Sequence, residues 1–374
     1  MKKLVLIILL AALFVIPGCT ILEQFAGTAQ PSEAPFEVPT AEPTAEPTAQ
    51  VTPSPTPEPT EAPTEEPTEV PTEEPSPTPI VTSEYKSRVN ILNLRKEPNT
   101  ESLVVAKIGF EDRVTVVEPA EGEFYTVLYN GETCYCYSRF LVPAKEELYG
   151  YLSPRYEYKT DEEGNIVFAE DGVTPITLKS ELIDIRLLIK DIEIYQIFGT
   201  DQNFTGEALY SRPVPVLQMD TAKKLAKAAE RFAEDGYKIK LYDCYRPKSV
   251  QYILYDIVQN SAYIADPYKS ASNHNRAAAV DITLIGPDGE ELDFPSPMHT
   301  FTKLVYRSSR GEWTQEQRKN VDYMTDVMLE CGFKYINIEW WHFSDVDYLD
   351  YIVLDIDMKD IPMYTARQLG FAAH

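Results

Sequence analysis

The sequence predicts an α+β protein with a small all-β module placed ahead of its mixed part. Residues 81–143 contain short runs of β-branched and aromatic side chains and no helical period longer than one turn. After residue 181 helix and strand signals alternate, and a helix–glycine–strand order occurs twice. Hydrophobic residues make up 44% of the 374, so folded cores are expected and wholesale disorder is excluded.

The charge and the cysteine content exclude two classes of protein, nucleic-acid binders and disulfide scaffolds. The chain has 34 basic and 59 acidic residues, a formal net charge of −25, and residues 31–80 hold 11 glutamates without any lysine or arginine. Phosphate contacts need clustered Lys and Arg, so we expect no nucleic-acid partner. Five cysteines in a chain of this length are too few for a disulfide scaffold.

The first residues have the pattern of a secretory signal. Lys2 and Lys3 precede an apolar run over residues 4–16, too short to span a bilayer comfortably, and Cys19 follows where cleavage is expected. An ordinary signal peptide, or a short anchor with an incidental cysteine, is the alternative. The segment resembles a bacterial lipoprotein signal. This implies that residues 1–18 are removed and that Cys19 is the lipidated N-terminus of a membrane-anchored, extracytoplasmic protein.

Residues 19–80 are predicted to form a disordered linker. Fifteen prolines fall between residues 31 and 80, and units such as Ala-Glu-Pro-Thr recur there. Proline removes backbone donors, and the segment has almost no apolar surface to bury, so an extended tether is expected. A plain spacer is the favoured interpretation, and a peptide ligand is the alternative.

Residues 81–143 are predicted to form a small β-barrel. Residues 114–117 and 124–129 have strand composition, and Asn130-Gly131 is a strong hairpin signal. The module resembles bacterial SH3 domains over some 60 residues, and the motifs that carry the resemblance are Leu92-Asn93-Leu94-Arg95 with Pro98, Tyr129-Asn130-Gly131 and Cys134-Tyr135-Cys136-Tyr137. The resemblance implies binding to the cell wall. A structural spacer without a ligand is the alternative.

Cys134 and Cys136 lie two positions apart on a predicted strand and therefore share one of its faces. Such a pair can indicate a metal or redox site. No second cysteine or histidine cluster lies near them in sequence, so we predict that both are packing residues.

Residues 144–180 are predicted as a connector with a hairpin at 161–165, and residues 181–374 as the catalytic module. Asp220 or Thr221 is expected to cap a helix that Gly236 ends, before a strand over 237–242. The same order returns as helix 314–330, Gly332 and strand 333–338, and the polar clusters expected after the two strands are Asp243-Cys-Tyr-Arg246 and Glu339-Trp-Trp-His342. Functional residues often lie where a strand gives way to a loop.

The four histidines, which are scarce enough to be informative, are His274, His299, His342 and His374. Asp281 follows His274 by seven residues inside an apolar strand, where an unpaired charge is costly and a divalent cation is one possible partner. Two imidazoles and one carboxylate are the ligand count of a catalytic zinc site. The alternative is that these are ordinary buried histidines and that Asp281 caps a turn, and the spacing alone favours it.

A larger set of motifs favours the metal site over this alternative. Its members, in chain order, are Asp184-Ile-Arg186, Asn203-Phe-Thr-Gly206, Asp243-Cys-Tyr-Arg-Pro247, Ser272-Asn-His274 to Asp281, and Glu339-Trp-Trp-His-Phe343. With these motifs the stretch from about residue 180 to 360 resembles the D-Ala-D-Ala dipeptidases of the VanX type, which are zinc D,D-peptidases of hedgehog-like fold.

The resemblance implies one Zn²⁺ per chain and a role for each matching residue. The implied zinc ligands are His274, Asp281 and His342, with Glu339 as the general base and Arg246 as the transition-state donor. Ser272, His299, Phe198 and Trp341 are the implied substrate-binding residues. The alternatives are that Ser272 only holds the His274 loop and that Trp341 is a packing residue of the pocket wall. The implied substrate is D-Ala-D-Ala or a peptidoglycan peptide that contains it.

The sequence also departs from the family pattern. Phe198 stands where a tyrosine is usual, and His299 where an aspartate is understood to hold the free amino group of the substrate. Cys244 and Ala277 replace glycines. A D,D- or L,D-carboxypeptidase acting on wall stem peptides, and a non-catalytic wall-binding lipoprotein with a degenerate peptidase fold, are therefore alternative functions.

Overall fold

The computed structural model describes residues 80–372 and has a mixed α/β fold. The predicted signal over 1–18, Cys19 and the predicted linker up to residue 79 lie outside the described residues. In the part that is described, none of the helices has both the length and the apolar character needed to cross a bilayer.

The first sheet is formed entirely by residues 82–143. Its strands are β1 (Thr82–Ser87), β2 (Leu92–Arg95), β3 (Val104–Ile108), β4 (Arg113–Val117), β5 (Phe124–Tyr129), β6 (Glu132–Tyr137) and β7 (Leu141–Pro143). They are antiparallel neighbours in the order β3-β2-β6-β5-β4-β1-β7. Within residues 80–372 no closed barrel is found, because β3 and β7 are the two ends of this order. The predicted SH3-like barrel is thus not confirmed.

The hairpin between β5 and β6 follows the sequence prediction. Asn130 and Gly131 have φ angles of 51° and 82°, which the tight turn requires of its two central residues. Cys134 and Cys136 are buried free thiols in the core of this sheet, together with Leu94. The prediction that they are packing residues is confirmed.

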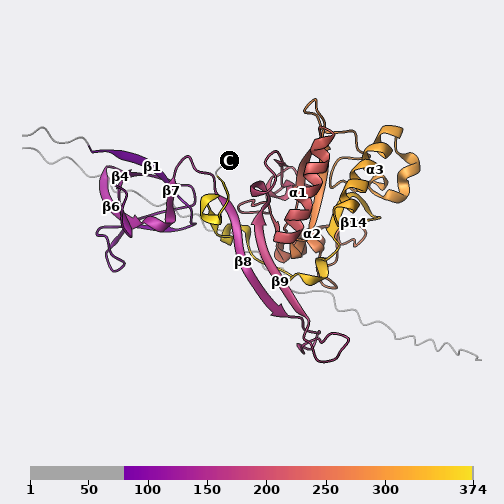
Figure 1. Cartoon of the computed structure of the whole chain (residues 1–374), viewed down its shortest axis with the longest axis horizontal. Helices are drawn as coiled ribbons and strands as arrows, with labels where there is room; N and C mark the ends of the chain where they lie inside the picture. The colour runs from indigo at the N-terminus through magenta and orange to yellow at the C-terminus, as the bar shows by residue number, and fades with distance from the viewer. Residues whose placement is uncertain (1–79, 373–374) are drawn as a thin grey trace, which may run out of the picture. The chain divides into compact units, whose positions relative to one another are not determined.

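A second sheet includes the long pair of strands labelled β8 and β9 in Figure 1. Its strands are β8 (Tyr149–Tyr158), β9 (Thr177–Asp184), β11 (Val216–Gln218) and β16 (Met363–Tyr364), in the order β11-β9-β8-β16. The predicted connector 144–180 contains β8. This strand pairs with β9 as far as Tyr158 opposite Thr177. The predicted turn at 161–165 is present, and the backbone N–H of Asp161 donates to the carbonyl of Asn165 at 3.0 Å.

The third sheet carries the candidate site. Its strands are β10 (Glu193–Ile194), β12 (Lys238–Asp243), β13 (Ala279–Ile285), β14 (Phe333–Ile336) and β15 (Glu339–Asp345), in the order β10-β12-β13-β15-β14. Only the β10–β12 pair is parallel among these described strands. The predicted strand 333–338 ends earlier, at Ile336. The segment from Glu339 to His342 therefore lies within the next strand and not in a loop, because residues 337 and 338 make the turn.

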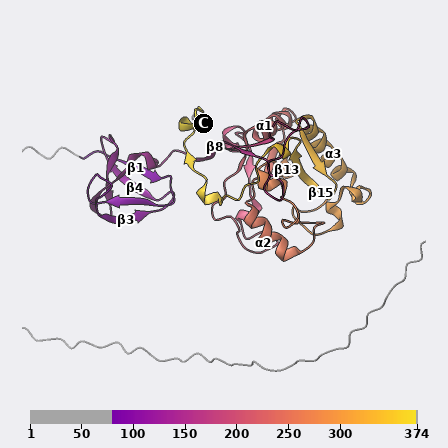
Figure 2. The same ribbon diagram turned by 90° about the horizontal axis from the view of Figure 1, so that it is seen from below.

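Three α-helices occur in the described part, α1 (Met219–Glu234), α2 (Lys248–Val258) and α3 (Gln315–Glu330). Apolar residues recur along α1 at helical spacing and bury one face of it. Leu225 and Phe232 of α1 share a core with Ile282 of β13 and Met324 of α3. The rings of Phe232 and Tyr323 lie 5.8 Å apart, where α1 and α3 pack side by side (Figures 1 and 2).

The start of α1 differs from the prediction. The helix begins at Met219, so neither Asp220 nor Thr221 is its cap. Asp220 pairs instead with Lys179 at 2.8 Å, and the hydroxyl of Thr221 donates to the buried Asp345 at 2.6 Å. These partners lie far away in sequence, so the local pattern gave no indication of them.

The other predicted helix ends are confirmed. Gly236 has a φ of 83° after α1, and the N–H of Tyr237 donates to the carbonyl of Phe232 at 2.9 Å, which closes a Schellman motif. Thr314 caps α3 and forms a capping box with Gln317. α1 is therefore followed directly by β12, and α3 by β14, and both strands belong to the third sheet.

Candidate metal centre and active site

Strand register places two of the three predicted ligands opposite each other. Asp281 of β13 pairs with His342 of β15, and on its other side Asp281 pairs with Asp243 of β12. His274 comes from the short 3-10 helix η4 (Asn273–Arg276), which leads into β13. The side chains of His274, Asp281 and His342 are all buried.

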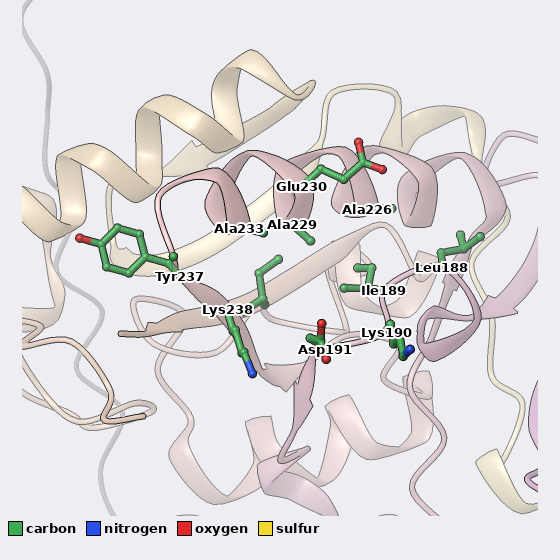
Figure 3. Close-up of a pocket in the computed structure, with 12 residues that line it drawn as sticks. Leu188, Ile189, Lys190, Asp191, Ala226, Ala229, Glu230, Ala233, Tyr237 and Lys238 are labelled. Atoms are coloured by element: carbon green, nitrogen blue, oxygen red, sulfur yellow. The ribbon is translucent and has the colours of Figure 1, made fainter. Parts of the chain in front are cut away.

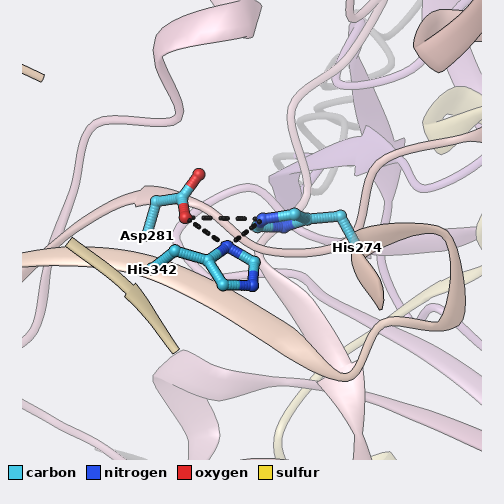
Figure 4. Close-up of side chains that lie close together, drawn as sticks. All are labelled: His274, Asp281 and His342. Atoms are coloured by element: carbon cyan, nitrogen blue, oxygen red, sulfur yellow. Dashed lines mark hydrogen bonds and ion pairs between the residues drawn. The ribbon is translucent and has the colours of Figure 1, made fainter. Parts of the chain in front are cut away.

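These three side chains converge on one point, as Figure 4 shows. His342 Nδ1 lies 3.0 Å from Asp281 Oδ1 and 3.2 Å from His274 Nε2. His274 Nε2 lies 3.4 Å from Asp281 Oδ1. Burial alone would raise the pKa of Asp281, but the imidazoles of His274 and His342 hold it well below its usual range. An ionised carboxylate and two ring nitrogens this close together can hold a metal ion.

The remaining ring nitrogens show which atoms are available as ligands. His274 Nδ1 lies 2.7 Å from the backbone carbonyl of Cys244, to which it can only donate, so Nε2 keeps its lone pair. His342 Nε2 lies 2.8 Å from the hydroxyl of Ser344, which also accepts from Asn273 Nδ2 at 2.8 Å. Sequence reasoning missed Ser344, which lies one residue beyond the Glu339–Phe343 motif, and the carbonyl of Cys244, because the residue type does not reveal a backbone contact.

Ser272 stabilises the segment that carries His274. Its hydroxyl accepts from the N–H of His274 at 3.3 Å, and its own N–H donates to Asn275 Oδ1 at 3.0 Å. Ser272 also lines the pocket described next. Its predicted contact with the substrate stays a prediction.

A pocket of about 250 Å³ opens over the three predicted metal ligands. Its walls come from α2 and the segment before it, from the loop after α2, from η4, β13, β14 and β15, and from the segment of His299. The lining residues are Arg246, Gln251, Ser261, Tyr263, Ile264, Ala265, Ala271, Ser272, Asn273, His274, Asp281, His299, Ile336, Ile338, Glu339 and His342. All the predicted metal-binding and catalytic residues lie in this list.

Glu339 lies beside the ligands with its side chain 19% exposed, and its Oε2 is 3.7 Å from His342 Nδ1. Burial, followed by the charge of Asp281, raises the pKa of Glu339 to about 7, against the opposing effects of His342 and Arg246. A carboxyl whose pKa is near neutrality can both accept and return a proton at physiological pH.

Arg246 reaches the same pocket from a buried polar network. Its Nε and Nη2 donate to Asp243 Oδ2 at 2.9 and 2.5 Å, and its Nη1 donates to Gln251 Oε1 at 2.7 Å. Asp243 also accepts from the hydroxyl of Tyr210 at 2.8 Å. These contacts use three of the five N–H groups of the guanidinium, so two are left for a ligand in the pocket. The ring of Phe198 lies beneath the guanidinium, 4.9 Å from its central carbon.

The other three predicted substrate-binding residues form one aromatic group. His299 lines the pocket, with its ring 5.0 Å from that of Phe198 and 5.7 Å from that of Trp341. Phe198 and Trp341 are buried behind it, 0% and 2% exposed, and are not among the residues lining the pocket. Direct contact of these two with a substrate stays a prediction. Burial lowers the pKa of His299 to about 4, so its ring is neutral at pH 7.

Two of the sequence motifs prove to be structural. Asp184 accepts from Arg186 Nε at 2.9 Å and from Nη2 at 2.7 Å, and also from the N–H of Gly150. Asn203 Nδ2 donates to the carbonyls of Thr200 and Glu207 at 2.6 and 2.8 Å. None of these residues lines the pocket. Their hydrogen bonds hold the backbone at Gly150 and in the turn over 200–207.

A second pocket, of about 290 Å³, lies between α1 and the segment 188–191 (Figure 3). Its walls are largely apolar, with Ala226, Ala229 and Ala233 on the helix side. It contains none of the candidate catalytic or metal-binding residues, and we assign no function to it.

Comparison with known proteins supports a peptidase. Residues 178–360 match the M15 peptidase family, described as D-ala-D-ala dipeptidase. The D-alanyl-D-alanine dipeptidase of Escherichia coli K12 is 29% identical over 165 residues, which is 44% of this chain and 84% of that protein. The enzyme of the same name from Enterococcus faecium is 28% identical over 166 residues, 39% of this chain and 82% of that protein. These matches support the predicted relationship to the VanX-type dipeptidases.

Among solved structures, one reported for the LdcB LD-carboxypeptidase is similar at 16% identity over 40% of this chain and 72% of that chain. Its TM-score of 0.25 is too low to support an inference.

Proposed function

We propose that residues 181–374 form a zinc-dependent peptidase that hydrolyses D-Ala-D-Ala, as the free dipeptide or at the end of peptidoglycan peptides. The observation that carries the proposal is the convergence of His274, Asp281 and His342 in the pocket that Glu339 and Arg246 also line. The dipeptidase relatives support the substrate class.

The donor set fits zinc. Two imidazoles and one carboxylate leave a coordination position open, as in catalytic and not structural zinc sites. Each imidazole has its other nitrogen hydrogen-bonded, His274 to the carbonyl of Cys244 and His342 to Ser344, which is the usual arrangement around protein-bound zinc. When bound, zinc lowers the pKa of water from about 15.7 to about 7 and polarises the scissile carbonyl.

The chain's own residues supply the proton transfers and the charge stabilisation. Glu339 takes a proton from the attacking water and returns it to the leaving amine, which its position beside the ligands and its raised pKa permit. Arg246 directs its two unused N–H groups at the oxygen of the scissile carbonyl as negative charge develops there. Ser272 keeps His274 in place while the substrate enters and leaves.

Two measurements on the same purified protein test this proposal. Zinc content is expected to be about one ion per chain. Release of D-alanine is expected from D-Ala-D-Ala or from a stem pentapeptide that ends in D-Ala-D-Ala. Glu339→Gln should retain the zinc and lose activity about 10²- to 10⁴-fold, since it removes only the base. His342→Ala should lose both.

Each negative result selects an alternative. Stoichiometric zinc without hydrolysis of any peptide in the panel would favour the non-catalytic wall-binding protein. Absence of bound metal would overturn the metallopeptidase assignment. Cleavage confined to stem peptides would favour a D,D-carboxypeptidase, and cleavage of an L,D bond an L,D-carboxypeptidase.

The proposed setting is the outer face of the cell membrane. The sequence supports a lipid anchor at Cys19, and residues 81–143 support an SH3-like module that binds the wall. Cys19→Ala is expected to release the protein from membranes into the medium. Deletion of residues 81–143 should reduce sedimentation with purified wall, and unchanged sedimentation would leave this module as a spacer.

A further inference from the structure

The two-stranded ribbon of β8 and β9 leaves one strand edge uncovered. β16 pairs with β8 only at Tyr149 and Gly150, and the N–H of Tyr151 donates to the carbonyl of Pro362 at 3.0 Å. In the part of the chain that the structure describes, no strand pairs with the outer edge of β8 beyond these residues. Figure 1 shows the ribbon extending away from the helices. A long free edge of this kind is a template on which another strand can pair.

The backbone groups on this free edge belong to alternate residues. The N–H of Lys159 donates to the carbonyl of Ile176 across the ribbon at 2.8 Å, so the N–H of Lys159 faces β9. Backbone groups alternate in direction along a strand, and the register with β9 is regular from Arg155 to Tyr158. The N–H and C=O groups of Tyr156 and Tyr158 therefore point outward, where no strand of the described residues pairs with them.

The side chains of this segment are exposed and form two faces. Tyr156 and Tyr158 are 68% and 58% exposed and share one face. Arg155 and Glu157 share the other face, where Arg155 Nη2 lies 3.8 Å from Glu157 Oε1 and the two side chains are 46% and 54% exposed. A two-stranded ribbon has little stability of its own in water. A partner strand that covers the two tyrosines would therefore stabilise it.

The order of the charges makes this edge complementary to itself. If β8 of a second copy lies antiparallel to it, with the two Tyr156 residues opposite each other, then Arg155 of each copy lies opposite Glu157 of the other. A shift by two residues in either direction places Arg155 opposite Arg155 or Glu157 opposite Glu157, and like charges directly opposite are destabilising. Charged side chains on an edge strand usually oppose pairing, but in this register they favour it.

The backbone fits the same register. The two Tyr156 residues would exchange both of their hydrogen bonds, and the N–H of Tyr158 in each copy would donate to the carbonyl of Pro154 in the other. Proline has no N–H and is tolerated on an edge strand, and here only its carbonyl is needed. We propose that a second copy of the chain pairs with this edge, β8 against β8, in a two-fold dimer. Each copy uses its free edge once, so the assembly closes at two copies.

Charge reversal tests the proposal on the purified chain. All forms carry Cys19→Ala, so that a lipid on this residue cannot cause association. Sedimentation velocity over a concentration series measures the dissociation constant of the dimer, which we expect below about 1 mM. Arg155→Glu and Glu157→Arg each make both cross-strand pairs like-charged, so each should raise this constant at least about tenfold.

Two combinations of the same changes should restore the dimer. The double variant Arg155→Glu with Glu157→Arg exchanges the charges and again places opposite charges across the interface. An equimolar mixture of the two single variants should form a heterodimer, because one copy then has two acidic residues and the other two basic ones. Arg231→Glu is the control, since it reverses an exposed charge that pairs with Glu234 on α1, and it should leave the constant unchanged. Urea unfolding checks that each variant is folded.

The outcomes decide the proposal independently of the proposed function, because neither Arg155 nor Glu157 lines the pocket. A monomer at all concentrations up to about 1 mM, species larger than a dimer, or a dimer that both single variants retain would overturn it. Failure of the double variant to associate would overturn it as well. Weaker association in each single variant, with recovery in the double variant and in the mixture, would support it.

Discussion

Asp243 and Arg246 form a buried ion pair in which two nitrogens of the guanidinium donate to one carboxylate oxygen, Oδ2 of Asp243. Asp243 is 0% exposed and Arg246 5%. Arg246 also lines the pocket. Under the proposed function Asp243 is thus a positioning residue, which would act on the substrate only through Arg246.

Asp243→Asn should therefore lower activity without loss of the metal. We expect kcat to fall about 10²-fold, because small displacements of a transition-state donor are costly, and the free energy of unfolding to fall by about 3 kcal/mol, because a buried charge loses its partner. Steady-state kinetics, zinc analysis and urea unfolding measure these effects. Asp220→Asn is the control, since it breaks a half-exposed pair with Lys179 worth at most about 1 kcal/mol. Unchanged kcat in Asp243→Asn would contradict the positioning role.

Ser344→Ala should weaken zinc binding while leaving all three ligands in place. The hydroxyl of Ser344 bonds His342 Nε2, and loss of such a contact typically costs about 10- to 100-fold in metal affinity. Competition with a chelator measures the dissociation constant. Ser211→Ala, whose hydroxyl bonds Asp357 outside the site, should leave the affinity unchanged. Equal affinity in wild type and Ser344→Ala would mean that the ring of His342 is oriented by its packing alone.

The pH dependence of kcat/KM should have an acid limb set by Glu339. The base must be ionised to act, so activity is lost as pH falls through its pKa, which burial raises to about 7 in the chain without metal. A bound cation favours the ionised form, so we expect the midpoint in the holoenzyme at or below about pH 7. Rates measured with wild type between about pH 4.5 and pH 8 give this midpoint. Activity that rises as pH falls below about 5 would exclude Glu339 as the base.

Two positions with left-handed backbone should respond oppositely to substitution. Gly236→Ala should lower the free energy of unfolding by about 1 to 2 kcal/mol, because its φ is 83° and an added Cβ would lie 3.3 Å from Pro287. Gln259→Gly should raise it by about 0.5 to 1 kcal/mol, since Gln259 ends α2 with a φ of 49° and its side chain is exposed. Urea unfolding of both variants checks the signs. Changes of the same sign would show that side-chain contacts, and not the backbone angle, dominate at one of the two positions.

Much of the site could be predicted because its residues stand in ordered motifs. The sequence indicated His274, Asp281 and His342 together with Glu339 and Arg246, and the structure brings all five into one pocket. The turn at residues 130–131 and the end of α1 at Gly236 followed from local chemistry, since a positive φ is required at those positions.

The remaining features depend on contacts between distant segments. Ser344 and the carbonyl of Cys244 orient the imidazoles. A single serine and a backbone oxygen cannot be recognised from a sequence pattern. Thr221 was expected as a helix cap because such residues are good caps, yet a buried Asp345 more than 100 positions later bonds its hydroxyl. The closure of the first sheet was expected from short strands alone, which do not specify how the two end strands meet.

Under the proposed function, the pairing of Asp281 with His342 across β13 and β15 makes metal affinity depend on the assembly of the sheet. If β15 slipped by one residue, the ring of His342 would turn to the other face and the ion would lose a ligand. Tight binding is therefore possible only after these strands have paired correctly. During denaturation, release of bound zinc would report the separation of β13 from β15. This signal would be independent of the unfolding of residues 81–143.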